Sequence, residues 1–334
     1  MFLLVSLIGL ALLFDVANGF HDSANSVATV VSTRVLSPAA AVVWAAFFNF
    51  IAFLIFKTKV ASSIADGVHR EYITLGLVGA AVAGAIIWDL LTWVAALPTS
   101  SSHALVGGLI GAAVVKAGYK AVDLHFVLKV AAFIVISPLL GMLLGALVMT
   151  ALMAIFGGRS PDWIQRHFSK LQLFSAGAYS LGHGGNDAQK TMGIIVTALI
   201  ATHHLVPGAN GKAPVPLWVV LSCHAAMALG TSLGGWRIVR TMGTRITKLT
   251  PADGFAAETA GAAALFFATS LGIPVSTTHT IAGGITGTGV VRRLSRIRWP
   301  VAKSIVWAWV LTMPCAGIIS ACCCGVARLL GAAV

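Results

Sequence analysis

Two short stretches of the sequence contain an aspartate surrounded by other polar side chains. Residues 19–26 read GFHDSANS and residues 184–191 read GGNDAQKT. Carboxylate and amide oxygens suit a hard cation such as Na⁺, and a carboxylate can also carry a proton. The two stretches therefore indicate a cation or proton site. Its candidate residues are Asp22, Asn25, Asn186, Asp187 and Gln189.

A second motif, also present twice, combines hydroxyl side chains with a histidine. Residues 98–103 read PTSSSH and residues 274–279 read PVSTTH, and each is followed by glycine-rich apolar sequence. Free backbone N–H groups at a helix N-terminus bind oxyanions, and hydroxyls can donate to the same ligand. One hydroxyl would serve as a helix N-cap, but three in a row, twice, exceed that need. The predicted anion-binding residues are Ser100, Ser101, Ser102, Ser276, Thr277 and Thr278.

The two motifs recur in the same order along the chain. The offset is 165 residues from Asp22 to Asp187 and 176 residues from Pro98 to Pro274, about half of the 334 residues. This order indicates an internal duplication. We therefore divide the chain into three parts. They are a first repeat at 1–156, a linker at 157–170 that is rich in turn-forming residues and predicted to be a loop, and a second repeat at 171–334.

The composition places these motifs in a membrane. Of all residues 58% are apolar and 10% are charged, whereas a soluble domain has about 25% charged residues. Mean hydropathy is +0.92, and several uncharged runs exceed the roughly 20 residues of a membrane helix. A soluble enzyme is excluded. The net charge of +12 falls mostly between apolar runs, where Lys and Arg orient helices, so no nucleic-acid partner is predicted.

The apolar segments of the two halves match one another in order. Each half is predicted to contain a helix interrupted by the aspartate motif, a plain helix, a re-entrant helical hairpin with the hydroxyl motif at its tip, and a long closing helix. The fold class is thus an all-α polytopic membrane protein built from two repeats. The segments are 1–36, 38–56, 72–117 and 124–156 in the first half and 171–203, 216–236, 254–291 and 300–332 in the second.

Basic residues predict the orientation of the halves. The strongest clusters, within 237–248 and 292–303, flank the second hairpin and are expected to be cytoplasmic. Both arms of the hairpin then begin and end on one side, each half crosses an odd number of times, and the second half is inverted relative to the first. Both termini are expected outside, and the linker 157–170 inside as a cytoplasmic connection.

Three further acids, Asp15, Asp89 and Glu258, lie inside apolar segments. A carboxylate at the centre of a membrane helix costs about 2.5–3.5 kcal/mol, so it either marks a functional route or is neutralised by its surroundings. For Asp15 and Asp89 a functional site and a buried salt bridge or helix cap both remain open.

These motifs resemble the signatures of the PiT family of inorganic phosphate transporters. Residues 19–29 and 184–193 are similar to its two Asp-containing copies, and residues 98–108 and 274–284 to its two hairpin tips. The resemblance covers essentially the whole chain. It implies a multi-pass inner (plasma) membrane protein that moves phosphate by secondary transport, with inverted repeats whose hairpins meet near mid-membrane.

The resemblance also implies roles for the candidate residues. The hydroxyl tips would bind phosphate together with Asn25, Asn186 and Lys190, and Asp22, Asp187 and Gln189 would serve the coupling cation. His21 and Lys190 replace Asn residues of the sodium-type signature, as in the bacterial low-affinity, proton-coupled branch. Lys190 either takes a cation's place beside Asp187 or snorkels to the interface. We expect the transported proton on Asp22, with Na⁺ coupling as the alternative.

The predicted function is a symporter that moves inorganic phosphate, alone or as a metal–phosphate complex, together with protons or Na⁺. A carrier of another oxyanion such as sulfate and an ion channel remain alternatives. A hydrolase is disfavoured, since catalysis needs one constellation and not two copies. We therefore expect no enzyme activity, no catalytic residue, no resident metal and no cofactor besides the coupling cation. The expected partners are phosphate and the lipid bilayer, and a homodimer is left open.

Overall fold

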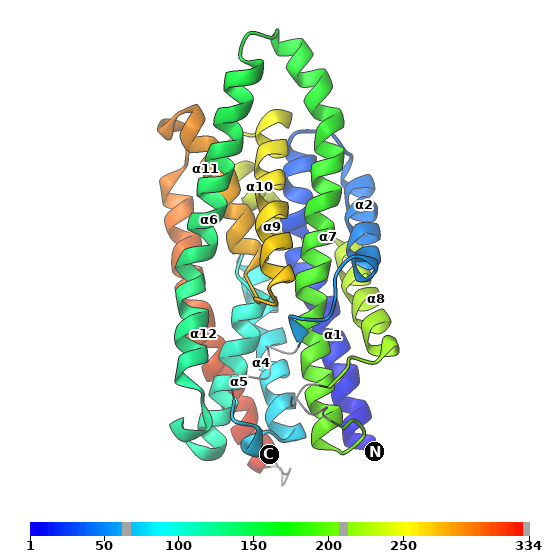
Figure 1. Ribbon diagram of the computed structural model, residues 1–334. Coiled ribbons are helices and arrows are strands. Elements are labelled where there is room, and N and C mark those ends of the chain that lie inside the picture. Colours follow the sequence, from blue (N-terminus) through cyan, green and yellow to red (C-terminus); the bar gives the residue numbers. More distant parts are fainter. Residues whose placement is uncertain (62–67, 207–212, 330–334) are drawn as a thin grey trace.

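The computed structural model describes residues 1–61, 68–206 and 213–329, which form a long bundle of α-helices (Figure 1). Short loops and 3₁₀ turns join the helices, and this part of the chain contains no β-strand, as predicted for an all-α protein. The helices are α1 (Phe2–Ser32), α2 (Pro38–Ile51), α4 (Leu75–Val94), α5 (Ser101–Ala117), α6 (Leu124–Phe156), α7 (Pro161–Ala201), α8 (Leu217–Leu233), α9 (Trp236–Arg240), α10 (Pro251–Ser270), α11 (Thr277–Arg292) and α12 (Trp299–Leu329).

The predicted interruption of two helices at the aspartate motifs is wrong. Both α1 and α7 run unbroken through their motifs. Many motif side chains find partners on other helices, and those that bond to their own helix, such as Gln189 to the Gly185 carbonyl, do so without interrupting it. The paired glycines of the second motif serve close packing instead, because Gly184 faces the backbone of Asn49 and Gly185 faces the ring of Phe56.

The linker is also shorter than the predicted loop at 157–170. Helix α7 already begins at Pro161, which has the fixed φ suited to a first helical position. The Ser160 side chain caps the helix by accepting from the backbone N–H of Trp163 at 3.3 Å. Only residues 157–160 therefore separate α6 from α7, and the polar residues that suggested a loop form a capped helix start.

The two predicted hairpins are present, and they point toward each other. Helices α4 and α5 form one, α10 and α11 the other, and they occupy opposite halves of the bundle with their tips toward its middle (Figure 1). His103 and His279, one turn beyond each tip, have ring centroids 4.9 Å apart. The tips, at residues 95–100 and 271–276, thus bring two distant parts of the chain together.

Helix packing follows the duplication. Helix α1 packs on α4 and α8, as α7 packs on α10 and α2, and α5 packs along α12, as α11 packs along α6. Glycines allow the last two approaches: Gly107 and Gly111 face the backbone of α12, and Gly141 and Gly145 face that of α11. Exchanging the two halves therefore maps each of these contacts onto its counterpart.

Apolar helices form the outside of the bundle. Among the described residues, α1, α4, α6 and α12 are long and apolar enough to cross a membrane, and α8 with the segment 236–245, bent by 62°, makes a fifth candidate. Side chains such as Leu139, Leu143 and Ile318 point outward and are more than half exposed. Such surfaces suit lipid and not water, so the protein is an integral membrane protein.

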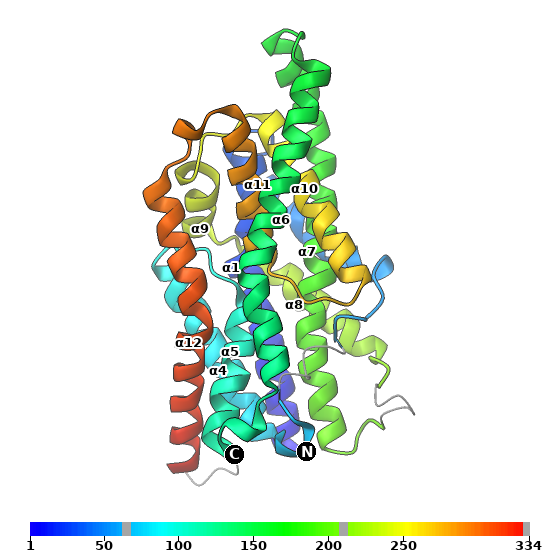
Figure 2. The same cartoon turned by 60° about the vertical axis from the view of Figure 1, so that its left-hand side comes forward.

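The ends of the bundle differ. The two ends of the described chain lie at one end, and the turn between α6 and α7 projects at the other (Figures 1 and 2). The two basic clusters meet, since the Arg298 N–H donates to the Ile246 carbonyl at 3.0 Å, and Arg292 and the α6–α7 turn line one groove. This grouping agrees with the predicted arrangement, in which both clusters and the linker share a side.

Candidate substrate and coupling site

The middle of α1 and the middle of α7 bring the two motif aspartates together. Asp22 and Asp187 are both buried, and their carboxylate oxygens and a ring nitrogen of His183 all lie within 4.8 Å of one another. His183 Nε2 is 3.6 Å from Asp187 Oδ2. Sequence reasoning missed His183, although it lies four residues before Asp187 and hence on the same helix face.

The tip of the second hairpin connects the two aspartates. The Thr277 hydroxyl donates to Asp187 Oδ2 at 3.2 Å, and the Thr278 hydroxyl donates to Asp22 Oδ2 at 3.3 Å. The Asn25 amide donates to the Thr278 hydroxyl at 2.9 Å. Five predicted residues thus belong to a single hydrogen-bonded cluster around the first turn of α11, namely Asp22, Asn25, Asp187, Thr277 and Thr278.

Lys190 lies inside this cluster and does not snorkel. Its side chain is 1% exposed. The ammonium contacts the Asp187 carboxylate and the Ser102 hydroxyl and donates to the Val275 carbonyl at 3.2 Å. A single charge therefore joins α7 to both hairpin tips, and the alternative of a lysine reaching the membrane surface is excluded.

The tip hydroxyls have two different local roles. Ser100 and Ser276 are helix N-caps, accepting from the backbone N–H groups of His103 at 3.3 Å and His279 at 3.2 Å. The Ser101 hydroxyl is buried and has no hydrogen-bond partner among the described residues. Two of the six predicted hydroxyls thus cap helices, and three others, on Ser102, Thr277 and Thr278, bond to side chains of the cluster. Ser101 is the one that is available to a ligand.

Two predicted residues point away from the aspartate pair. The Asn186 amide donates to the Thr269 hydroxyl at 3.0 Å and to the Ile273 carbonyl at 3.3 Å. Gln189 accepts from the Val60 N–H at 2.8 Å and donates to the Gly185 carbonyl at 2.6 Å. These side chains fasten α10 and the segment after α2 to α7.

His21 is a partner of Asp22 that the sequence reasoning did not assign. Its Nδ1 lies 2.7 Å from Asp22 Oδ1, and its Nε2 lies 3.1 Å from the Thr92 hydroxyl on α4. The sequence analysis therefore missed a titratable neighbour of Asp22. The signal was present, because His21 is one of the two positions that depart from the sodium-type signature.

Within the described part of the chain, the three other acids of the apolar segments, Asp15, Asp89 and Glu258, neither cap a helix nor form a salt bridge. Asp15 accepts from the Thr191 hydroxyl at 2.5 Å, and Glu258 accepts from the Gln172 amide at 3.0 Å and the Ser175 hydroxyl at 2.5 Å. Both oxygens of Asp89 lack a hydrogen-bond partner within the described part of the chain. For Asp15 and Asp89 the salt-bridge and helix-cap alternatives are thus wrong.

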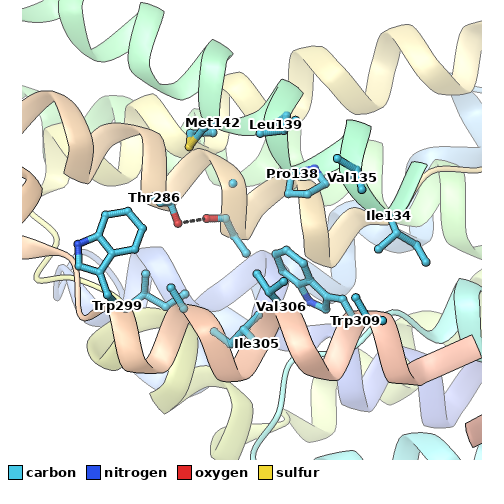
Figure 3. Close-up of a pocket in the computed structure, with 15 residues that line it drawn as sticks. Ile134, Val135, Pro138, Leu139, Met142, Thr286, Trp299, Ile305, Val306 and Trp309 are labelled. Atoms are coloured by element: carbon cyan, nitrogen blue, oxygen red, sulfur yellow. Dashed lines mark hydrogen bonds between the residues drawn. The ribbon is translucent and has the colours of Figure 1, made fainter. Parts of the chain in front are cut away.

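An apolar groove of about 290 Å³ lies outside this polar cluster, between α6, α11 and α12 (Figure 3). Its one labelled hydroxyl, on Thr286, donates to the Ala282 carbonyl at 2.8 Å and offers nothing to an anion. Trp309 separates the groove from the tips: its ring stacks on His279 at 4.1 Å, and its Nε1 donates to the Pro98 carbonyl at 2.9 Å. The groove suits apolar chains and not phosphate.

A buried polar centre between two long helices and the tips of two opposed hairpins is the architecture of a membrane transporter. The family model of the phosphate transporter family matches residues 18–320, and the chain belongs to this family. A relative from Rhizobium meliloti (strain 1021), described as a "probable low-affinity inorganic phosphate transporter", is 54% identical over 96% of this chain and 95% of its own length. A Bacillus subtilis (strain 168) relative with the same description is 40% identical over 93% of each chain.

A solved structure confirms the fold. It is described as "The sodium-dependent phosphate transporter" and aligns with a TM-score of 0.90 over 99% of this chain and 100% of its own, at 24% sequence identity.

Proposed function

We propose that this protein is a secondary active carrier of inorganic phosphate, driven by protons, that works by alternating access in the plasma membrane. The observation that carries the proposal is that Asp22 and Asp187 lie close together and both accept hydrogen bonds from hydroxyls of a hairpin tip. Anion-binding groups and titratable groups thereby share one buried centre, which is what coupling of an anion to a cation requires. Family membership and the described relatives support phosphate as the anion.

In this proposal phosphate binds between the two tips. Ser101, Ser102, Thr277 and Thr278 lie in the first turns of α5 and α11, where helix N–H groups favour an anion. The Lys190 ammonium contacts Ser102, so it balances the charge of a phosphate bound there. Asn25, which bonds to Thr278, orients the second tip.

Proton coupling follows from the position of Lys190. Its three contacts are a carboxylate, a hydroxyl and a backbone carbonyl, which are the oxygen types that coordinate Na⁺ in broken-helix transporters. A fixed ammonium at this place repels a second cation beside Asp187. The remaining variable charge is the proton on the Asp22 side of the centre.

Inverted repeats explain how the same residues can face both sides of the membrane. The exchange of helix partners between the halves and the opposed hairpins support this relation. Rocking of the hairpins about the central site would open it to either end in turn.

The test is uptake of labelled phosphate into proteoliposomes, with pH and Na⁺ gradients imposed separately. We expect accumulation above equilibrium with an acidic outside and no response to Na⁺. Accumulation driven by Na⁺ alone would assign the coupling to Na⁺, and equilibration without accumulation would identify a channel. Excess sulfate and added Mg²⁺ in the same assay test the choice of anion and a metal–phosphate substrate.

A further inference from the structure

The His21 ring connects the aspartate motif of α1 to the first hairpin. Nδ1 is 2.7 Å from Asp22 Oδ1, and Nε2 is 3.1 Å from the Thr92 hydroxyl oxygen. All three side chains are buried. The ring therefore bridges a carboxylate on α1 and a hydroxyl on α4, and both contacts are buried.

The surroundings of Thr92 decide which ring nitrogen donates. The single hydroxyl hydrogen of Thr92 is directed to the backbone, with the Trp88 carbonyl at 2.9 Å and the Asp89 carbonyl at 3.1 Å. Its oxygen accepts from the Thr99 hydroxyl at 3.0 Å. The Thr99 hydroxyl also lies 3.4 Å from His21 Nε2, so its hydrogen has two possible acceptors. With that hydrogen directed to Thr92, the nearer of the two, Thr92 can only accept from His21, and Nε2 carries a hydrogen.

One proton must accordingly lie between His21 Nδ1 and Asp22. A 2.7 Å contact between nitrogen and oxygen is a hydrogen bond. If Nδ1 is bare, the carboxyl must hold the hydrogen; if Nδ1 holds it, the ring is a cation beside a carboxylate. In both cases the His21–Asp22 pair holds one proton in addition to the one on Nε2.

We infer that His21 and Asp22 share the transported proton, that this conformation is the proton-loaded one, and that Asp89 is the carboxyl through which the proton enters or leaves. The inference rests on the proposed proton-coupled function and names the groups that carry it out.

Asp89 is placed to exchange a proton with this pair. It lies three residues before Thr92 on the same face of α4 and is 1% exposed, and neither of its oxygens has a hydrogen-bond partner among the described residues. The titratable groups that face it are His21 and Asp22 from α1 and Asp187 from α7, with the Ser101 hydroxyl on α5. Those that face His21 are Asp22 and Asp89.

The second half shows that the fold needs neither group at these positions. Helices α4 and α10 each have 20 residues, and the offset of 176 aligns both their ends and their tips. Asp89 then corresponds to Leu265, which is fully buried. His21 corresponds to Asn186, whose amide donates to Thr269 on α10. In the second half, Asn186 and Leu265 therefore fill the equivalent positions, and neither of them can titrate.

The proposed step involves only one proton. Asp89 binds it from water when the first hairpin opens, its O–H bond breaks as the proton joins the His21–Asp22 pair, and the carboxylate of Asp89 is regenerated. Release to the other side reverses the order once the centre faces that side. No bond other than those to the proton is made or broken.

The test replaces each group by its counterpart from the second half, as His21→Asn and Asp89→Leu, with Asp89→Asn as the isosteric variant. Two rates are measured in proteoliposomes: accumulation of labelled phosphate under an inward acid gradient, and phosphate–phosphate exchange at equal pH on both sides. We expect accumulation to fall about tenfold or more, within the usual range of coupling between sites, while exchange is kept and becomes insensitive to pH. His167→Gln and Asp162→Asn, at exposed positions, are the matched controls.

Three results are decisive. Variants that accumulate phosphate like the wild type would overturn the inference. Variants that lose exchange together with accumulation would also overturn it, because the residues would then bind substrate or support the fold. A wild-type protein without acid-driven accumulation would instead overturn the proposed function, whatever the variants do.

Discussion

The two aspartate motifs have the same geometry but different electrostatics. In the first copy Asp22 faces a histidine, and the residue three positions later is the neutral Asn25. In the second copy the residue three positions after Asp187 is Lys190, whose ammonium contacts it. A histidine can gain or lose a proton near neutral pH, whereas a paired lysine keeps its charge. Asp187 also has a histidine nearby, His183, but only Asp187 is contacted by an ammonium. In the proposed mechanism the first copy is therefore the variable site and the second the fixed site.

The hairpins differ in the same way. The first has its acid, Asp89, close to the tip and beside the variable site, whereas the second has Leu265 there. The second has two acids, Asp253 at its outer end and Glu258 further in, where Leu77 and Val82 lie in the first. Each hairpin thus has a carboxyl at a different depth, and the difference between halves lies in titratable groups and not in the backbone.

The largest expected effect is a loss of stability when Asp187, but not Asp22, is replaced by asparagine. Asp187→Asn leaves the Lys190 ammonium buried without a countercharge, which costs about 3–5 kcal/mol. We expect little folded protein and no uptake. Asp22→Asn leaves no buried ammonium unpaired and keeps an acceptor oxygen at this position, so the protein should fold with normal thermal stability and still fail to accumulate phosphate. Thermal unfolding in detergent and acid-driven uptake measure both.

A double variant sharpens this contrast. Asp187→Asn combined with Lys190→Asn removes both charges, so stability should recover while transport does not. Equal stability of the two single variants would show that the copies do not differ in fixed charge.

The helical hairpins and most residues of the central cluster could be predicted from the sequence, but the individual side-chain contacts could not. Apolar length, two repeated motifs and basic clusters predicted the hairpins and the central residues, because these depend on composition and local chemistry. The continuity of α1 and α7 was missed, since a run such as Gly184–Asp187 is a poor helix former and only packing against α2 shows why it stays helical. The contacts of Asn186 and Gln189 depend on side-chain direction, which spacing does not give.

Lys190→Asn is expected to have the next largest effect. It makes the second copy like the first and leaves Asp187 with neutral partners, Thr277 among them. Asp187 can then bind a proton itself, so folding should be affected less than by Asp187→Asn. We expect weaker phosphate uptake, a changed pH dependence and a new stimulation by Na⁺. Uptake against pH, with and without Na⁺, measures this, and an unaltered profile with full activity would remove Lys190 from the mechanism.

The tips should differ when single hydroxyls are removed. The Ser101 hydroxyl faces Asp89 but makes no hydrogen bond among the described residues, so Ser101→Ala should remove a donor to bound phosphate. The expected cost is about 1.5–3 kcal/mol, or roughly 10- to 100-fold in affinity. Thr277 already donates to Asp187, so Thr277→Ala should weaken binding less. Both variants should retain some transport. Equilibrium binding of labelled phosphate gives both affinities, and unchanged values would leave the helix N–H groups as the anion site.

The smallest effect is expected at Ser100 and Ser276, the residues in which the halves are most alike. Each accepts from the N–H group three residues ahead, at 3.3 and 3.2 Å, in the geometry of a helix N-cap. Replacement of a cap by alanine costs about 1 kcal/mol of stability. Because the caps are equivalent, Ser100→Ala and Ser276→Ala should lower the unfolding temperature by similar small amounts and leave phosphate affinity nearly unchanged. A large loss of affinity in only one of them would mean that its hydroxyl leaves the cap to bind phosphate, and that the asymmetry of the molecule extends to the helix caps.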